Sequence, residues 1–67
     1  MNYYLEISRK IEEFCNAEPA PDERIEYLRK GAKIRTLYLD SLLLQENGVE
    51  TGKEIEEIYQ KIAKLVD

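Results

Sequence analysis

The chain has 67 residues, of which 43% are hydrophobic and 36% are charged, and it carries a net charge of −4. This composition predicts one globular helical domain over 1–67 and excludes collagen-like, disordered and membrane-spanning chains. The acidic balance argues against DNA as a partner, because a DNA-binding surface gains most of its affinity by neutralising phosphates.

A first helix is expected over about 2–16. Four apolar residues recur along it at steps of three and four, which places them on one helical face. They are Tyr4, Ile7, Ile11 and Phe14. Pro19 ends this helix, because the residue before a proline avoids helical backbone angles. The connection over 17–21 is short, so the next helix is expected to return antiparallel to the first.

A second helix is expected over about 21–46, because no stop signal precedes Gly48, which suits the left-handed position just past a helix end. It has about 25 residues and a length of roughly 38 Å. Apolar side chains lie around most of its circumference rather than along one stripe. One broad stripe, interrupted by Arg35, contains Ile25, Leu28, Ala32, Leu39, Leu42 and Leu43. The other large apolar residues are Tyr27, Ile34, Leu37, Tyr38 and Leu44.

A third helix is expected over about 51–66. Thr51 and Glu54 have the T-x-x-E spacing of a capping box, in which each side chain bonds the backbone N–H of the other residue. Four apolar residues follow at steps of three and four, so this helix has one apolar face. They are Ile55, Ile58, Ile62 and Leu65.

These elements predict an all-α fold, a three-helix antiparallel bundle with a long central helix. The two outer helices, of about 15 residues each, are expected to cover opposite halves of the central helix and to overlap only near 31–36. Each half is then a two-helix layer without an enclosed core, so we expect the chain to dimerise through the central helix by two-fold packing. The alternative is a monomer whose central helix is kinked at Gly31, so that both apolar stripes face inward.

The residues that most often carry catalysis and bind metals are nearly absent. The chain has no histidine, so the commonest general acid–base residue is missing, and it has one cysteine. Cys15 falls on the apolar face of the first helix and is expected to be a buried, unreactive thiol. No metal-binding motif is present. We therefore expect no enzymatic activity, no metal and no cofactor.

Cysteine content and hydropathy also bear on location. One cysteine excludes an intrachain disulfide, and the N-terminus carries no apolar run of signal-peptide length. Apolar runs such as 42–44 are far shorter than a membrane span. These features predict a cytoplasmic protein with no membrane partner.

Basic residues cluster in the first half of the second helix. They are Arg24, Arg29, Lys30, Lys33 and Arg35. Only Glu26 opposes them, so 24–35 has a local net charge of +4. One interpretation is a solvated face, with ion pairs such as Glu26–Lys30 and further pairs to the acidic neighbouring helices. The other is a surface that meets an anionic partner.

The leading hypothesis is a non-enzymatic protein–protein interaction module, a homo-oligomeric regulator or inhibitor that binds a partner's surface. Tyrosine is enriched at interfaces, and the chain has five. The residues expected to form the partner or oligomer interface are Tyr27, Lys30, Ile34, Leu37, Tyr38 and Leu44. The alternative is an oligomer that binds a small anionic or phosphorylated ligand at a subunit junction. Its candidate residues, together with a tyrosine, are Arg24, Arg29, Lys33 and Arg35.

Overall fold

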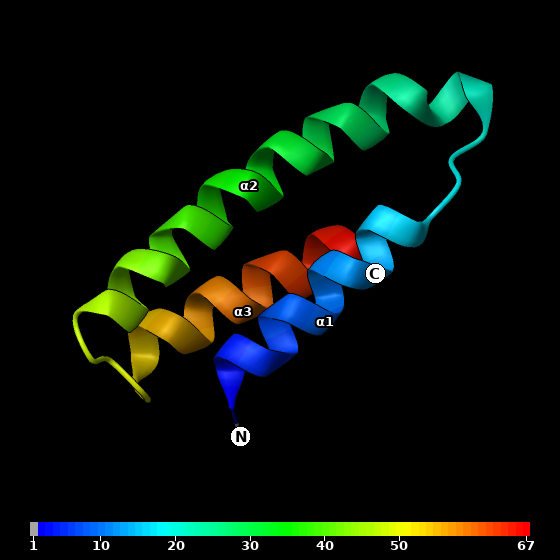
Figure 1. Ribbon diagram of the computed structural model, residues 1–67. Coiled ribbons are helices and arrows are strands. Elements are labelled where there is room, and N and C mark those ends of the chain that lie inside the picture. The colour runs from blue at the N-terminus through cyan, green and yellow to red at the C-terminus, as the bar shows by residue number, and fades with distance from the viewer. Residues whose placement is uncertain (1) are drawn as a thin grey trace.

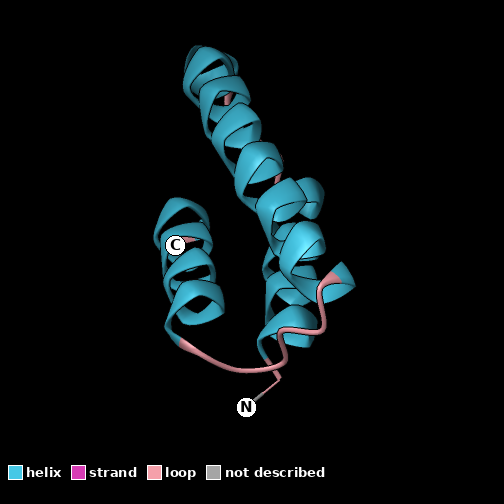
Figure 2. Cartoon of the chain, turned by 90° about the vertical axis from the view of Figure 1, so that its left-hand side faces the viewer, coloured by secondary structure: helices cyan, strands magenta, loops and turns pink. Residues whose placement is uncertain are grey.

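The computed structural model describes residues 2–67, which contain helices and loops but no strand (Figures 1 and 2). The helices are α1 (Tyr3–Asn16), a short 3-10 helix η1 (Pro21–Glu23), α2 (Arg24–Glu46) and α3 (Lys53–Val66). The prediction of an all-α bundle with a long central helix is confirmed. No helix within this described part of the chain is long and apolar enough to cross a membrane.

The ends of the helices follow from local chemistry. The Asn2 side chain accepts a hydrogen bond from the backbone N–H of Leu5 and so caps the start of α1. Just past the C-terminal end of α2, Gly48 has a φ of 76°. The N–H of Gly48 bonds the carbonyl of Gln45, and the N–H of Val49 bonds that of Leu44. This pair of bonds is a Schellman motif, so the predicted left-handed cap is confirmed.

The predicted capping box at the start of α3 is wrong. The residue that precedes α3 is Gly52, with a φ of 133°, and no side chain caps the helix. The helix begins at Lys53, so Thr51 lies one residue too early to take the N-cap position. A glycine is needed here because other residues rarely adopt this backbone angle.

Both α1 and α3 run antiparallel to α2, so they run parallel to each other and lie side by side (Figure 1). The rings of Tyr3 and Tyr59 are 5.6 Å apart, and Lys10 Nζ lies 3.1 Å from a carboxylate oxygen of Asp67. The hydroxyl of Tyr4 donates to the carbonyl of Val49, which holds the start of α1 against the α2–α3 loop.

The expectation that the two outer helices cover opposite halves of α2 is therefore wrong. Each has 14 residues, and both start near the C-terminal end of α2 and extend along the same stretch of it. The alternative in which both apolar stripes face inward is not observed either, because Ile25, Leu28, Leu39 and Leu43 are exposed. Two neighbours on the same side of α2 enclose one small core. Its buried apolar residues are Ile7, Ile34, Ile55 and Ile62.

Candidate interaction surface

The side of α2 that faces away from α1 and α3 carries a stripe of exposed aliphatic side chains. We call this set of residues the outer stripe; its members are Ile25, Leu28, Ala32, Leu39 and Leu43. The four large side chains are 67%, 61%, 51% and 58% exposed, in chain order. At about 100° per residue the five positions span an arc of about 60°, and at 1.5 Å per residue they extend over about 27 Å. They therefore form one apolar stripe, which Arg35 interrupts between Ala32 and Leu39.

The residues that the sequence suggested for a partner or oligomer interface lie mostly on the opposite side of α2. Ile34 is buried, and Leu37 and Leu44 pack partly buried against the core. Tyr27 is half-buried, whereas Tyr38 is exposed at the edge of the packed face. Within one chain this face is largely covered by α1 and α3, whereas the outer stripe stays exposed.

Side-chain size explains which face of α2 packs inward. The packed face carries Gly31, and a Cβ atom placed there would lie 3.4 Å from a ring carbon of Phe14. It also carries Ser41, which is fully buried and donates a hydrogen bond to the carbonyl of Tyr38 at 2.6 Å. Small residues let α1 approach closely, so this face packs inward although the other carries more aliphatic residues.

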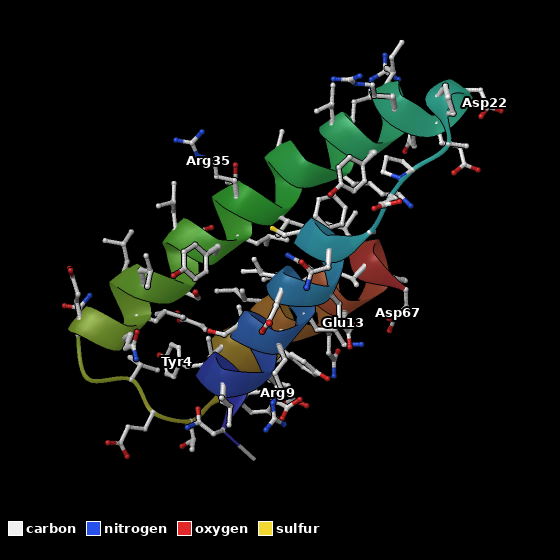
Figure 3. The ribbon with its side chains drawn as sticks, turned by 45° about the vertical axis from the view of Figure 1, so that its right-hand side comes forward. Tyr4, Arg9, Glu13, Asp22, Arg35 and Asp67 are labelled. Atoms are coloured by element: carbon white, nitrogen blue, oxygen red, sulfur yellow. The ribbon has the colours of Figure 1, made fainter. Side chains whose placement is uncertain are left out.

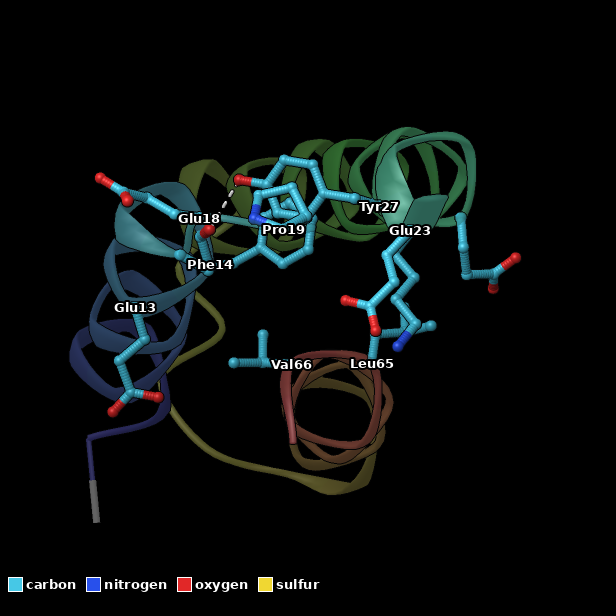
Figure 4. Close-up of a pocket in the computed structure, with 11 residues that line it drawn as sticks. Glu13, Phe14, Glu18, Pro19, Glu23, Tyr27, Leu65 and Val66 are labelled. Carbon is cyan, nitrogen blue, oxygen red and sulfur yellow. Dashed lines mark hydrogen bonds between the residues drawn. The ribbon is translucent and has the colours of Figure 1, made fainter. Parts of the chain in front are cut away.

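Tyr27 joins the end of α1 to the first half of α2. Its ring stacks on that of Phe14 with centroids 4.3 Å apart, and its hydroxyl donates to the Phe14 carbonyl at 2.7 Å (Figure 4). Lys30 lines the adjacent groove of about 490 Å³, together with Leu65 and Val66. Four acidic residues also line it: Glu13, Glu18, Glu23 and Glu26. This groove has a negative balance of charge and disfavours an anion.

A second groove, between α2 and α3, has the opposite charge. It has a volume of about 500 Å³, and Lys33, Lys61 and Lys64 line it with the aliphatic side chains of Leu37 and Leu65. Lys33 was a candidate anion-binding residue, whereas sequence reasoning overlooked Lys61 and Lys64. Their spacing of three residues on a helix was the available signal, because such residues share one side.

The three arginines proposed with Lys33 do not join this groove. Arg24, Arg29 and Arg35 are exposed and lie along or beside the outer stripe. Arg35 projects away from the bundle (Figure 3). The structure therefore brings Lys33 together with two lysines of α3 and leaves the arginines at the rim of the apolar surface.

The charged side chains of α2 make no ion pair with residues 2–67. The ion pairs in this range join Lys10 to Glu13 and to Asp67, and Arg9 to Glu6. The hydrogen bond from Lys10 to the Asp67 carboxylate raises the pKa of Lys10 above its ordinary value. The expected Glu26–Lys30 pair is not formed, so the charges of α2 stay available to other molecules.

The prediction that Cys15 is buried is wrong, because its thiol is exposed. Cys15 lies about 100° around the helix from Phe14, beyond the part of α1 that α2 and α3 cover. The described residues contain no group of three or more acidic or sulfur side chains placed to hold a metal ion.

Comparison with protein-family models, with curated proteins and with solved structures gave no match.

Proposed function

We propose that this chain is a non-enzymatic protein-interaction module that works through the outer stripe of α2, as a regulator or inhibitor that occupies another protein surface. The observation that carries this proposal is the exposure of four large aliphatic side chains on one stripe of α2. Contiguous apolar patches with polar rims mark interaction sites on soluble proteins. Arg24, Arg29 and Arg35 supply such a rim.

Self-association through α2 is part of this proposal. Fully burying one Leu or Ile side chain contributes about 1.5–3 kcal/mol, and a small domain with four buried aliphatic residues has little stability in reserve. A second copy offers the same stripe, and two-fold symmetry makes such a surface complementary to itself. The oligomer interface therefore lies on the outer stripe and not on the residues around Ile34.

Light scattering on Leu39→Lys tests the self-association through the outer stripe. We expect the wild-type chain to have the mass of a dimer at tens to hundreds of micromolar. Leu39→Lys should have the mass of a monomer with unchanged helix content, because it places a charge inside the stripe. Gln60→Lys, at an exposed position of α3, adds the same charge and should leave the mass unchanged. Equal masses for all three proteins would contradict self-association through this stripe.

The groove lined by Lys33, Lys61 and Lys64 favours a second candidate function, the binding of a small anion with an apolar tail. A phosphate or carboxylate would meet the three ammonium groups while its tail contacts Leu37 and Leu65. A ligand at 100 times its Kd adds about 2.7 kcal/mol of stability. We expect an alkyl phosphate to raise the melting temperature of the wild-type chain but not of a Lys61→Gln, Lys64→Gln variant. No shift in the wild type would exclude this candidate.

A further inference from the structure

The apolar residues on the outer side of α2 follow a heptad pattern. Positions separated by alternating steps of three and four residues follow the outer stripe. They also include Arg35 and Leu42, which lie at its edge. The heptad positions are Ile25, Leu28, Ala32, Arg35, Leu39 and Leu42, and all of them except Arg35 are apolar. A repeat of 3.5 residues keeps apolar side chains facing one neighbouring helix over several turns. The surface therefore has the spacing that suits a second long helix.

Charges beside this surface are segregated along α2. Arg24 and Arg29 flank its N-terminal half, and Asp40 and Glu46 lie at its C-terminal half. All four are exposed and none forms an ion pair within residues 2–67. A parallel pair of α2 helices would set like charges together, whereas an antiparallel pair sets basic residues beside acidic ones.

We propose that two copies of this chain pair through α2 in an antiparallel arrangement, with Arg24 and Arg29 of each copy beside Glu46 and Asp40 of the other. This inference rests on the proposed function, because it requires the outer stripe to bind protein.

The positions of these residues agree on one register. The midpoint of Arg24 and Glu46 is 35, and the midpoint of Arg29 and Asp40 lies between 34 and 35. The midpoint of the outer stripe, from Ile25 to Leu43, is 34. A two-fold axis near 34–35 therefore aligns both charge pairs and the apolar surface together. In this register Leu28 of each copy meets Leu39 or Leu42 of the other.

Two of these charges, Arg24 and Glu46, are unfavourable in an isolated helix. The positive end of a helix dipole is its N-terminus, where Arg24 lies, and the negative end is its C-terminus, where Glu46 lies. Each charge is thus placed at the end that disfavours it. An antiparallel partner reverses this, because its acidic end lies beside Arg24 and its basic end beside Glu46.

A charge exchange within one chain tests the arrangement. The half-exchanged variant carries Arg24→Glu and Arg29→Asp, and the fully exchanged variant adds Asp40→Arg and Glu46→Arg. Each dimer contains four pairs. An exposed pair changes the dissociation constant by a factor of about 2–3, so the half-exchange should weaken the dimer by about 30-fold or more. The full exchange should restore the dimer to within about threefold of the wild type, because every pair is again between opposite charges.

The exchanged residues at positions 29 and 40 are too far apart to pair with each other within one chain. Arg29 and Asp40 are about 16 Å apart along the helix at 1.5 Å per residue. The full exchange also places charges where the helix dipole favours them, so the variant is expected to fold. The dissociation constant of each protein can be measured by sedimentation equilibrium, and its helix content by circular dichroism.

The possible outcomes separate this inference from the function on which it rests. Loss of the dimer in the half-exchange and recovery in the full exchange supports antiparallel pairing. A full exchange that stays dissociated overturns it, while the outer stripe keeps its proposed function if Leu39→Lys still dissociates the wild-type dimer. A wild-type chain that is monomeric at every concentration overturns both this pairing and self-association.

Discussion

One tyrosine connects α1 to α2 through both a ring stack and a hydrogen bond. Tyr27 stacks its ring on Phe14 and donates its hydroxyl to the Phe14 carbonyl. The Phe14 carbonyl also accepts from the backbone N–H of Ala17. A carbonyl oxygen has two lone pairs, so the Tyr27 hydroxyl is its second donor at the end of α1. Tyr27 is therefore a structural residue of the bundle, although the sequence placed it among interface candidates.

Tyr27→Phe should lower the free energy of unfolding by about 1 kcal/mol, because it removes the hydroxyl and keeps the ring stack. Urea unfolding followed by circular dichroism measures the loss. Tyr38→Phe is the matched control: its hydroxyl has no hydrogen-bond partner among residues 2–67, and its side chain is 36% exposed. Equal losses for the two variants would contradict the role assigned to the Tyr27 hydroxyl.

At the scale of the element, the C-terminal end of α2 is closed by backbone bonds that need a glycine, and by the Asn47 side chain, which donates to the Leu43 carbonyl. Gly48 adopts a φ of 76° and permits the hydrogen bonds that close the last turn of α2. These bonds place Val49 where its carbonyl accepts from Tyr4. The glycine thus determines both where α2 stops and how α1 is held against the following loop.

Gly48→Ala should destabilise the protein by about 1–2 kcal/mol, because a Cβ atom is strained at this backbone angle. Space is not the cause, since nothing lies within 4 Å of the added atom. Gly48→Asn should cost less, because asparagine tolerates the left-handed region better than alanine does. Thermal unfolding of the two variants checks this order, and a larger loss for asparagine would refute the conformational explanation.

At the scale of the molecule, α2 has one face covered by α1 and α3 and one face open. Two neighbours of 14 residues cover one side of a helix of 23 residues, and the open side carries the outer stripe. The two copies of Arg35 lie closest to the axis of the proposed dimer and repel each other. Ala32 and Thr36 leave room around them, so this repulsion weakens the dimer without preventing it.

Arg35→Leu should therefore tighten the dimer by about tenfold or more, because it removes two like charges and completes the heptad with an apolar side chain. A dilution series followed by light scattering measures the change. Lys33→Leu makes the same change of charge on the face toward α3 and should leave the dimer unaltered. Equal tightening by both variants would indicate an effect of net charge and not of the interface.

Much of the fold was predictable from sequence. Apolar periodicity predicted α1 and α3, and Pro19 and Gly48 predicted where α1 and α2 end. These signals act between residues a few positions apart, so no knowledge of the tertiary structure is needed to interpret them. The start of α3 was placed too early, because the T-x-x-E spacing at Thr51 indicated a cap that the backbone of Gly52 replaces.

The candidate surface was predictable only in part. The excess of apolar side chains on α2 and the arginines near Arg35 are properties of one helix and follow from its sequence alone. Which face stays exposed depends on where α1 and α3 lie, and this is a matter of contacts between distant residues. Gly31 and Ser41 admit the ring of Phe14 and the neighbouring helices to one face of α2, so close packing and not the number of aliphatic residues left the outer stripe open.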